Sequence, residues 1–96
     1  MPVYFIAQVQ VNDAEAYGRY AREAGGSLAD GSVRVLAADD APTLVEGEWH
    51  GPRTVMMEFE SEEAFRAWYD SPEYQQAAKL RYDATVTNAV VVHGLG

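Results

Sequence analysis

Two polar side chains on predicted strands are the main candidates for chemistry, Glu58 as a catalytic base and Gln8 beside it. We expect their strands to be neighbours, and both side chains to lie near the C-terminal strand ends on the sheet face without helices. A carboxylate there could abstract a proton while the carboxamide holds a carbonyl group. Burial would favour this role, because a desolvated carboxylate binds a proton more tightly. The alternative is structural: Glu58 forms an ion pair with Arg34 or Arg53, or a hydrogen bond between subunits.

Four further side chains are candidate ligand contacts. His93 ends the last predicted strand and should approach Tyr4, so the two could donate protons if Val90 and Val92 face the helices. A partly solvated histidine at the end of the sheet is the simpler alternative. Tyr74 could direct its hydroxyl at a pocket or at a neighbouring subunit, although core packing explains it equally well. Met56 is an adaptable packing residue that suits a core or a pocket wall.

Other kinds of site are excluded by composition and missing motifs. The chain has no cysteine and only two histidines, far apart in the sequence, which makes a poor metal site. It also lacks the glycine-rich phosphate and dinucleotide motifs and the serine nucleophile motif. We therefore expect neither a metal nor a bound cofactor. Seven basic against 15 acidic residues give a net charge of -8, which argues against nucleic acid and anionic membranes as partners.

The elements that would position these residues alternate along the chain. Alternating apolar residues predict strands, and helix-start signals at Asn12, Ser61 and Ser71 predict helices. The predicted strands cover residues 3–11, 32–38, 53–60 and 85–93, the helices lie at about 14–28, 61–69 and 72–82, and residues 43–48 could add a short strand. A turn is expected at Asp30–Gly31. No apolar run is long enough to span a membrane and the start lacks a basic leader, so we expect a cytoplasmic protein.

This order is typical of an α+β ferredoxin-like split βαβ sandwich, in which helices cover one face of a four-stranded antiparallel sheet. The length of 96 residues fits a single domain, 1–96. The strand order expected for this fold is 4-1-3-2. The other sheet face is also apolar, with Tyr4, Ile6 and Met56, and exposing such a patch is unfavourable. We therefore expect a second identical subunit to cover it. Scattered apolar surface residues of a monomer are the alternative.

A longer pattern resembles a known family. The run Trp68–Gln75, together with Asp13–Tyr17, Arg53 and Arg81, is similar to the family catalogued as domain of unknown function 1330. The resemblance covers nearly the whole chain and implies a dimeric α/β barrel, in which two subunits oppose their sheets. It brings no established substrate. Members commonly have an arginine where this chain has Ala37, so the resemblance does not support anion binding at that position.

Three functions follow as hypotheses. The first is an uncharacterised small dimeric α/β barrel protein that binds or transforms a small, mostly apolar molecule without a bound cofactor, with Gln8, Glu58 and Tyr4 as polar contacts. The second is a non-catalytic structural or interaction homodimer, whose interface alone explains the apolar face. The third is a heme-binding or monooxygenase-like protein, in which His93 would be the axial ligand. Whether the chain is an enzyme stays open at this point.

Overall fold

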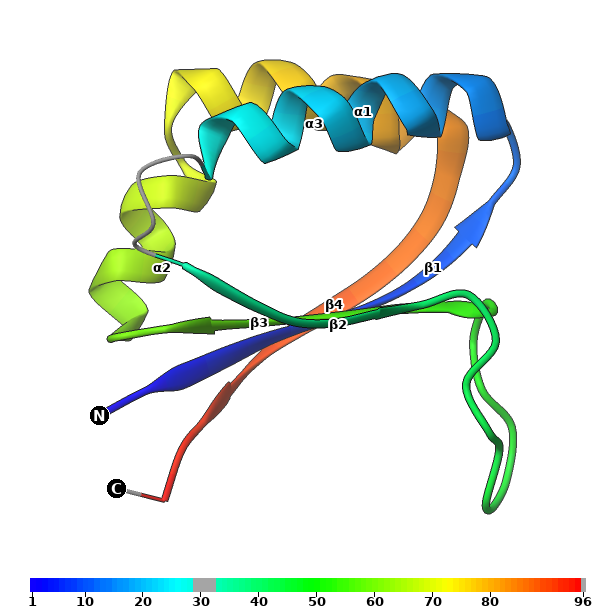
Figure 1. The fold of residues 1–96 in the computed structure, drawn as a ribbon, viewed down its shortest axis with the longest axis horizontal. Coiled ribbons are helices and arrows are strands. Elements are labelled where there is room, and N and C mark those ends of the chain that lie inside the picture. The colour runs from blue at the N-terminus through cyan, green and yellow to red at the C-terminus, as the bar shows by residue number, and fades with distance from the viewer. Residues whose placement is uncertain (29–32, 96) are drawn as a thin grey trace.

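One antiparallel sheet and three helices make up this computed structural model, which describes residues 1–28 and 33–95. The elements are β1 (Val3–Val11), α1 (Ala14–Ser27), β2 (Arg34–Asp39), β3 (Arg53–Phe59), α2 (Glu62–Tyr69), α3 (Pro72–Ala84) and β4 (Thr85–His93). The strand order is β2-β3-β1-β4, and every neighbouring pair is antiparallel. The helices lie on one side of the sheet and leave its other face bare (Figure 1). The predicted α+β ferredoxin-like fold is confirmed.

The helices begin where short polar side chains can bond the free amides of a first turn. The hydroxyls of Ser61 and Ser71 accept backbone N–H groups of α2 and α3 at 3.0 and 3.2 Å, as predicted. α1 differs by one residue, because its cap is Asp13 and not Asn12. The Asn12 backbone N–H is instead bonded to the carbonyl of Ala84, at 2.7 Å. The described helices are all too short and too polar to cross a bilayer.

The core lies between the helices and the facing side of the sheet. Along β1, the alternate residues Val3, Phe5, Ala7 and Val9 are buried under the helices. Aromatic rings of α2 and α3 fill the space above them: Phe65, Trp68, Tyr69 and Tyr74. Burying an apolar side chain of this size contributes about 1.5–3 kcal/mol, so this layer accounts for much of the stability.

The centre of the outward face of the sheet is apolar, as the alternation predicts. Tyr4 and Ile6 of β1 are only partly buried there. In the register of the sheet Ile6 lies between Met56 of β3 and Val90 of β4, and Tyr4 is paired with Val92. The two valines expose 57% and 45% of their surface. A chain that folds alone would leave this whole patch in water.

The connection from β2 to β3 is a long loop, and the short strand predicted at residues 43–48 is wrong. Residues 40–52 extend from the sheet on the side away from the helices (Figure 1). Gly47 has a positive φ of 73° within the predicted strand, and Gly51, with a φ of 61°, turns the chain before β3. At the end of the loop, the Trp49 indole N–H is bonded to the hydroxyl of Thr54, at 2.9 Å.

β2 is the least regular strand. It starts at Arg34, and the turn predicted at Asp30–Gly31 lies outside the described residues. Its pairing with β3 shifts between Val35 and Ala37, so one extra residue stands on the β2 side. Such a bulge bends an edge strand and lets its register change without breaking the rest of the ladder.

Candidate functional site

The structure separates Gln8 from Glu58. β1 and β3 are antiparallel, and their register pairs Gln8 with Thr54 and Glu58 with Tyr4. The C-terminal ends of antiparallel neighbours lie at opposite ends of the pair. Four residues of strand, or about 13 Å, therefore separate the two side chains. The expectation that a carboxylate and a carboxamide act side by side is wrong.

Glu58 instead forms an ion pair with Arg34, at 3.4 Å between Oε1 and Nη1. This was one of the structural roles predicted for it. The Arg34 side chain is 77% exposed, and solvated pairs of this kind contribute about 0–1 kcal/mol. Glu58, Gln8, Tyr4 and Met56 share the outward face of the sheet, so four of the six predicted site residues lie outside the helix-covered interior.

His93 lies on the opposite face from Tyr4. It is paired with Val3, which is buried under the helices, whereas Tyr4 is paired with Val92 and faces outward. A proton-donor pair of His93 and Tyr4 requires Val90 and Val92 to face the helices. Both valines face outward, so this prediction is wrong. The imidazole Nε2 is hydrogen-bonded with Glu62 of α2, and both side chains are more than half exposed. The arrangement is a surface pair at one edge of the sheet.

A cavity of about 220 Å³ lies between α1, α3 and the helix side of the sheet. It exists because α1 packs mainly against α3 and stands clear of the strands. The residues of α1 that line the cavity are small at three positions, Ala21, Ala24 and Gly25, so their side chains do not fill the gap. The strand side of the lining is apolar, with residues such as Val55 and Met57. Of the predicted site residues, Tyr74 alone is among the described lining.

Three phenol groups are among the polar groups that line the cavity. The Tyr20 and Tyr74 hydroxyls lie 2.9 Å apart, and Tyr17 accepts a hydrogen bond from Arg53 Nε at 2.9 Å. Burial, and next the neighbouring Tyr74, raise the pKa of Tyr20 far above its ordinary value. The Tyr20 phenol is therefore neutral at neutral pH, and it can orient a ligand by hydrogen bonding but not abstract a proton.

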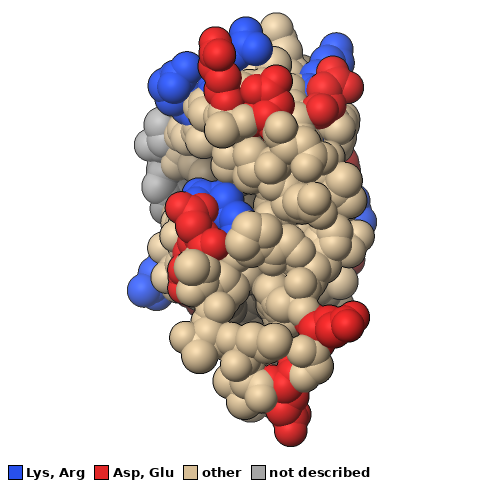
Figure 2. All heavy atoms as spheres, turned by 90° about the vertical axis from the view of Figure 1, so that its right-hand side faces the viewer, with Lys and Arg blue, Asp and Glu red and all other residues tan. Residues whose placement is uncertain are grey.

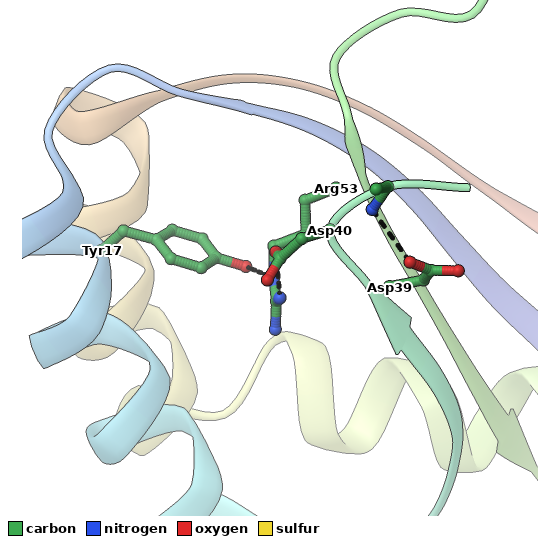
Figure 3. Close-up of polar contacts among 5 residues, drawn as sticks. Tyr17, Asp39, Asp40 and Arg53 are labelled. Carbon is green, nitrogen blue, oxygen red and sulfur yellow. Dashed lines mark hydrogen bonds and ion pairs between the residues drawn. The ribbon is translucent and has the colours of Figure 1, made fainter. Parts of the chain in front are cut away.

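Arg53 joins the cavity to the surface (Figure 3). Its Nη1 lies 2.7 Å from Asp40 Oδ1, and the Tyr17 hydroxyl and the Asp40 carboxylate both point at its guanidinium. Burial acts to lower the pKa of Arg53, but these two hydrogen bonds outweigh burial and leave the pKa above its ordinary value. The neighbouring Asp39 accepts the backbone N–H of Ala41 at 2.9 Å and so fixes the turn that presents Asp40.

Arg81 of α3 is a second cation in the lining, and it is only 8% exposed. Its guanidinium carbon lies 5.7 Å from the ring centre of Tyr20 and 4.9 Å from that of Tyr82. None of the ion pairs within residues 1–28 and 33–95 involves Arg81. Burial acts to lower its pKa, but the Tyr74 and Tyr20 phenols outweigh burial, so the pKa is raised and the group stays charged.

Sequence reasoning alone did not assign Tyr17, Tyr20, Arg53 or Arg81 to a site. A usable signal was present, because Tyr17, Tyr20, Ala21 and Ala24 recur at three- and four-residue steps on one stripe of α1. When tyrosines lie beside small residues on a helix stripe that faces a sheet, they indicate a cavity with polar groups at its edge. The stripe does not show which strand residue contacts it. Arg53 and Tyr17 are far apart in the sequence and meet only in the folded chain.

Metal and heme sites find no support in these residues. Across the described part of the chain, no three histidine, aspartate or glutamate side chains lie close enough together to hold a metal ion. His93 is bonded to Glu62 at the surface and is not among the described residues that line the cavity, and His50 is bonded to the Val86 carbonyl. The residues present do not fit an axial heme ligand inside the cavity.

Solved structures with the same fold include proteins of known and unknown activity. A protein of unknown function from Rhodopseudomonas palustris superposes with a TM-score of 0.80 at 22% identity, covering 99% of this chain and 83% of that one. SnoaB, a cofactor-independent oxygenase from Streptomyces nogalater, gives 0.69 at 15% identity, covering 99% and 94%. A dimeric ferredoxin-like protein of unknown function from Thermobifida fusca gives 0.70 at 19%, covering 98% and 92%. At these identities the likeness shows the fold alone.

Sequence comparison identifies the family. No protein with a curated description is significantly similar to this chain. Residues 2–95 match the model of one protein family, which agrees with the resemblance carried by Trp68–Gln75. The chain therefore belongs to the family described as Domain of unknown function (DUF1330).

Proposed function

We propose that the protein is a homodimer in which each subunit binds one small, mostly apolar molecule in the cavity between α1, α3 and the sheet. The observation that carries this proposal is the cavity itself, about 220 Å³ of space with a mainly apolar lining. Well-packed cores seldom contain voids much larger than a water molecule. An apolar cavity of about 150 Å³ can bind benzene, so the space suits a single substituted ring or a branched chain of similar size.

The polar groups of the cavity are arranged to orient such a ligand. Tyr17 accepts a hydrogen bond from Arg53, which leaves the phenol hydrogen of Tyr17 free for a ligand oxygen. Tyr74, the predicted ligand contact that lies here, bonds Tyr20 at the far wall. A few polar atoms in an otherwise apolar lining are typical of small-molecule sites.

The homodimer is supported by the bare outward face of the sheet. Ile6, Met56 and Val90 form an apolar row across three strands. A second copy with its sheet against this row would remove it from water and would also enclose Gln8 and Glu58. The Thermobifida fusca protein with this fold is dimeric, which supports the same assembly here. Tyr4 and Met56 are then interface residues in our proposal, not ligand contacts.

Binding is better supported than base catalysis. The described lining of the cavity contains no histidine, aspartate or glutamate, and its three phenols take part in hydrogen bonds. A reaction in this site would need a substrate that is itself activated, as in oxygenation without a cofactor. SnoaB shares the fold and is a cofactor-independent oxygenase, but at 15% identity it supports no activity for this chain. The competing hypothesis is a homodimer with a cavity that binds nothing.

Benzyl alcohol, a neutral single-ring probe, tests the binding proposal by calorimetry and thermal unfolding. A ligand that binds only the folded state raises the melting temperature with concentration. Ala24→Leu should abolish this shift, because it adds a larger side chain to the lining of the cavity. The matched control is Gly26→Leu, which adds a leucine to the same helix at a position outside the described lining. An equal response in all three proteins would refute the site.

A further inference from the structure

We propose that the cavity selects an anion, namely a small molecule with an apolar body and one carboxylate, and that this carboxylate replaces Asp40 on Arg53. The inference deepens the proposed function and rests on it, since it assumes that the cavity binds a ligand. It adds the charge of the ligand and the residue that recognises it.

The cavity reverses the charge balance of the chain. The protein has 15 acidic and seven basic residues and a net charge of -8. Yet two of those basic residues, Arg53 and Arg81, are in the described lining of this one cavity, which contains no carboxylate. Figure 2 shows the side of the molecule from which the loop between β2 and β3 extends: charged groups gather mostly at the helical and loop ends, and one basic group lies against acidic ones in a largely uncharged middle. A positive interior in an acidic protein favours a negative ligand.

Arg81 supplies a charge that the described fold does not neutralise. The side chain is only 8% exposed, and its described neighbours include the phenol of Tyr74 and the ring faces of Tyr20 and Tyr82. Ring faces stabilise a guanidinium less completely than a carboxylate does. The phenols keep Arg81 charged, but none of the described ion pairs gives it an opposite charge. An anion in the cavity would supply that opposite charge.

Arg53 provides the recognition, because it already holds a carboxylate in the required geometry. Asp40 lies 2.7 Å from Nη1, but its side chain is 82% exposed while that of Arg53 is 23% exposed. The aspartate can therefore rotate into water while the arginine stays fixed by its hydrogen bond to Tyr17 (Figure 3). A ligand carboxylate on Arg53 keeps the ion pair and places the apolar body of the ligand over the cavity. The free Tyr17 hydrogen can complete the contact.

Benzoate and benzyl alcohol, which have the same ring, separate this inference from the proposed function. At neutral pH we expect benzoate to bind about tenfold more tightly than benzyl alcohol, the effect of one charge-assisted contact. Arg53→Gln should remove that preference, so that the two probes bind this variant with similar affinity. Asp40→Asn should tighten benzoate binding severalfold, because it removes the competing carboxylate. Arg34→Gln is the control, since that arginine also pairs with a carboxylate but lies on the outward face of the sheet.

The outcomes are distinct. Equal binding of the two probes to the native protein would overturn the inference and leave the proposed function standing. Loss of the benzoate preference in Arg34→Gln as well as in Arg53→Gln would also overturn it, because the preference would then reflect overall charge. Binding of neither probe would overturn both proposals. Circular dichroism of each variant shows that a lost response does not come from a lost fold.

Discussion

The phenol of Tyr20 illustrates how burial decides what a single side chain can do in this protein. Its hydroxyl lies 2.9 Å from that of Tyr74, a residue with no exposed surface. Burial first, and then the proximity of Tyr74, raise the pKa of Tyr20. In the unfolded chain the same group should ionise near pH 10. At Tyr20, the folded and unfolded states therefore differ in bound protons only in alkaline solution.

We expect the contribution of Tyr20 to the free energy of unfolding to be fully present below about pH 10 and to be lost as pH rises further. The unfolded state releases the proton first, so alkali favours unfolding. Tyr20→Phe should cost about 1–3 kcal/mol at pH 8, because it removes one hydrogen-bond partner of the buried Tyr74 hydroxyl. Above pH 10 its stability should fall less steeply than that of the native protein. Urea unfolding between pH 8 and 11 measures both effects.

Phe59→Leu is the control for this prediction, because it changes a buried core ring without removing a titratable group. Its stability should fall above pH 10 as steeply as that of the native protein. If Tyr20→Phe loses stability above pH 10 as steeply as the native chain, the buried phenol is not what couples the fold to pH.

At the scale of elements, the loop between β2 and β3 depends on one close backbone contact. Gly51 has φ of 61°, and a Cβ atom at this position would lie 2.6 Å from the backbone of Val9. Both the backbone angle and the space therefore require glycine. Gly47 has a similar φ of 73°, but a Cβ atom there would meet nothing within 4 Å. Comparing substitutions at Gly47 and Gly51 therefore separates the effect of the backbone angle on stability from the effect of the steric contact.

Gly51→Ala should destabilise the protein clearly more than Gly47→Ala. We expect about 1 kcal/mol for Gly47→Ala, from the left-handed backbone alone. At Gly51 the added methyl group must also displace the end of β1, which should bring the loss to about 3 kcal/mol or more. Thermal unfolding would show the difference as roughly 4–8 °C per kcal/mol in a domain of this size. Equal losses of stability in the two variants would mean that the loop can move away from β1 without a cost in free energy.

Local chemistry explains why most elements could be predicted from the sequence and why the site could not. Ser61 and Ser71 cap helices through amides three residues away, so a short window of sequence contains the whole interaction. The face on which His93 lies depends on the register with β1, and the run Val90-Val91-Val92 is apolar in both alternations. Strand direction likewise separated Gln8 from Glu58. The cavity depends on the distance between α1 and the sheet, which no short segment of the sequence determines.

At the scale of the whole molecule, the two faces of the sheet differ, because helices cover one face and leave the other bare (Figure 1). The helix face forms a core around the cavity, while Ile6 and Met56 stand at the centre of the bare outward face. Stable interfaces bury about 800 Å² on each partner, and a sheet of four strands can supply such an area. The Arg34–Glu58 ion pair lies on the same face and would be partly desolvated in a dimer. The proposed assembly and the proposed ligand site should therefore be separable by mutation.

Ile6→Lys should convert the proposed dimer to a monomer, because it places a charge in the middle of the apolar row on the outward face. Gln76→Lys, which adds the same charge at an exposed position on α3, should leave the mass unchanged. Light scattering at micromolar concentration should give twice the mass of one chain for the native protein and for this control. A native protein with the mass of one chain would contradict the dimer. Because the cavity lies on the other side of the sheet, a folded Ile6→Lys monomer should still bind benzyl alcohol, and loss of that binding would mean that the partner completes the site.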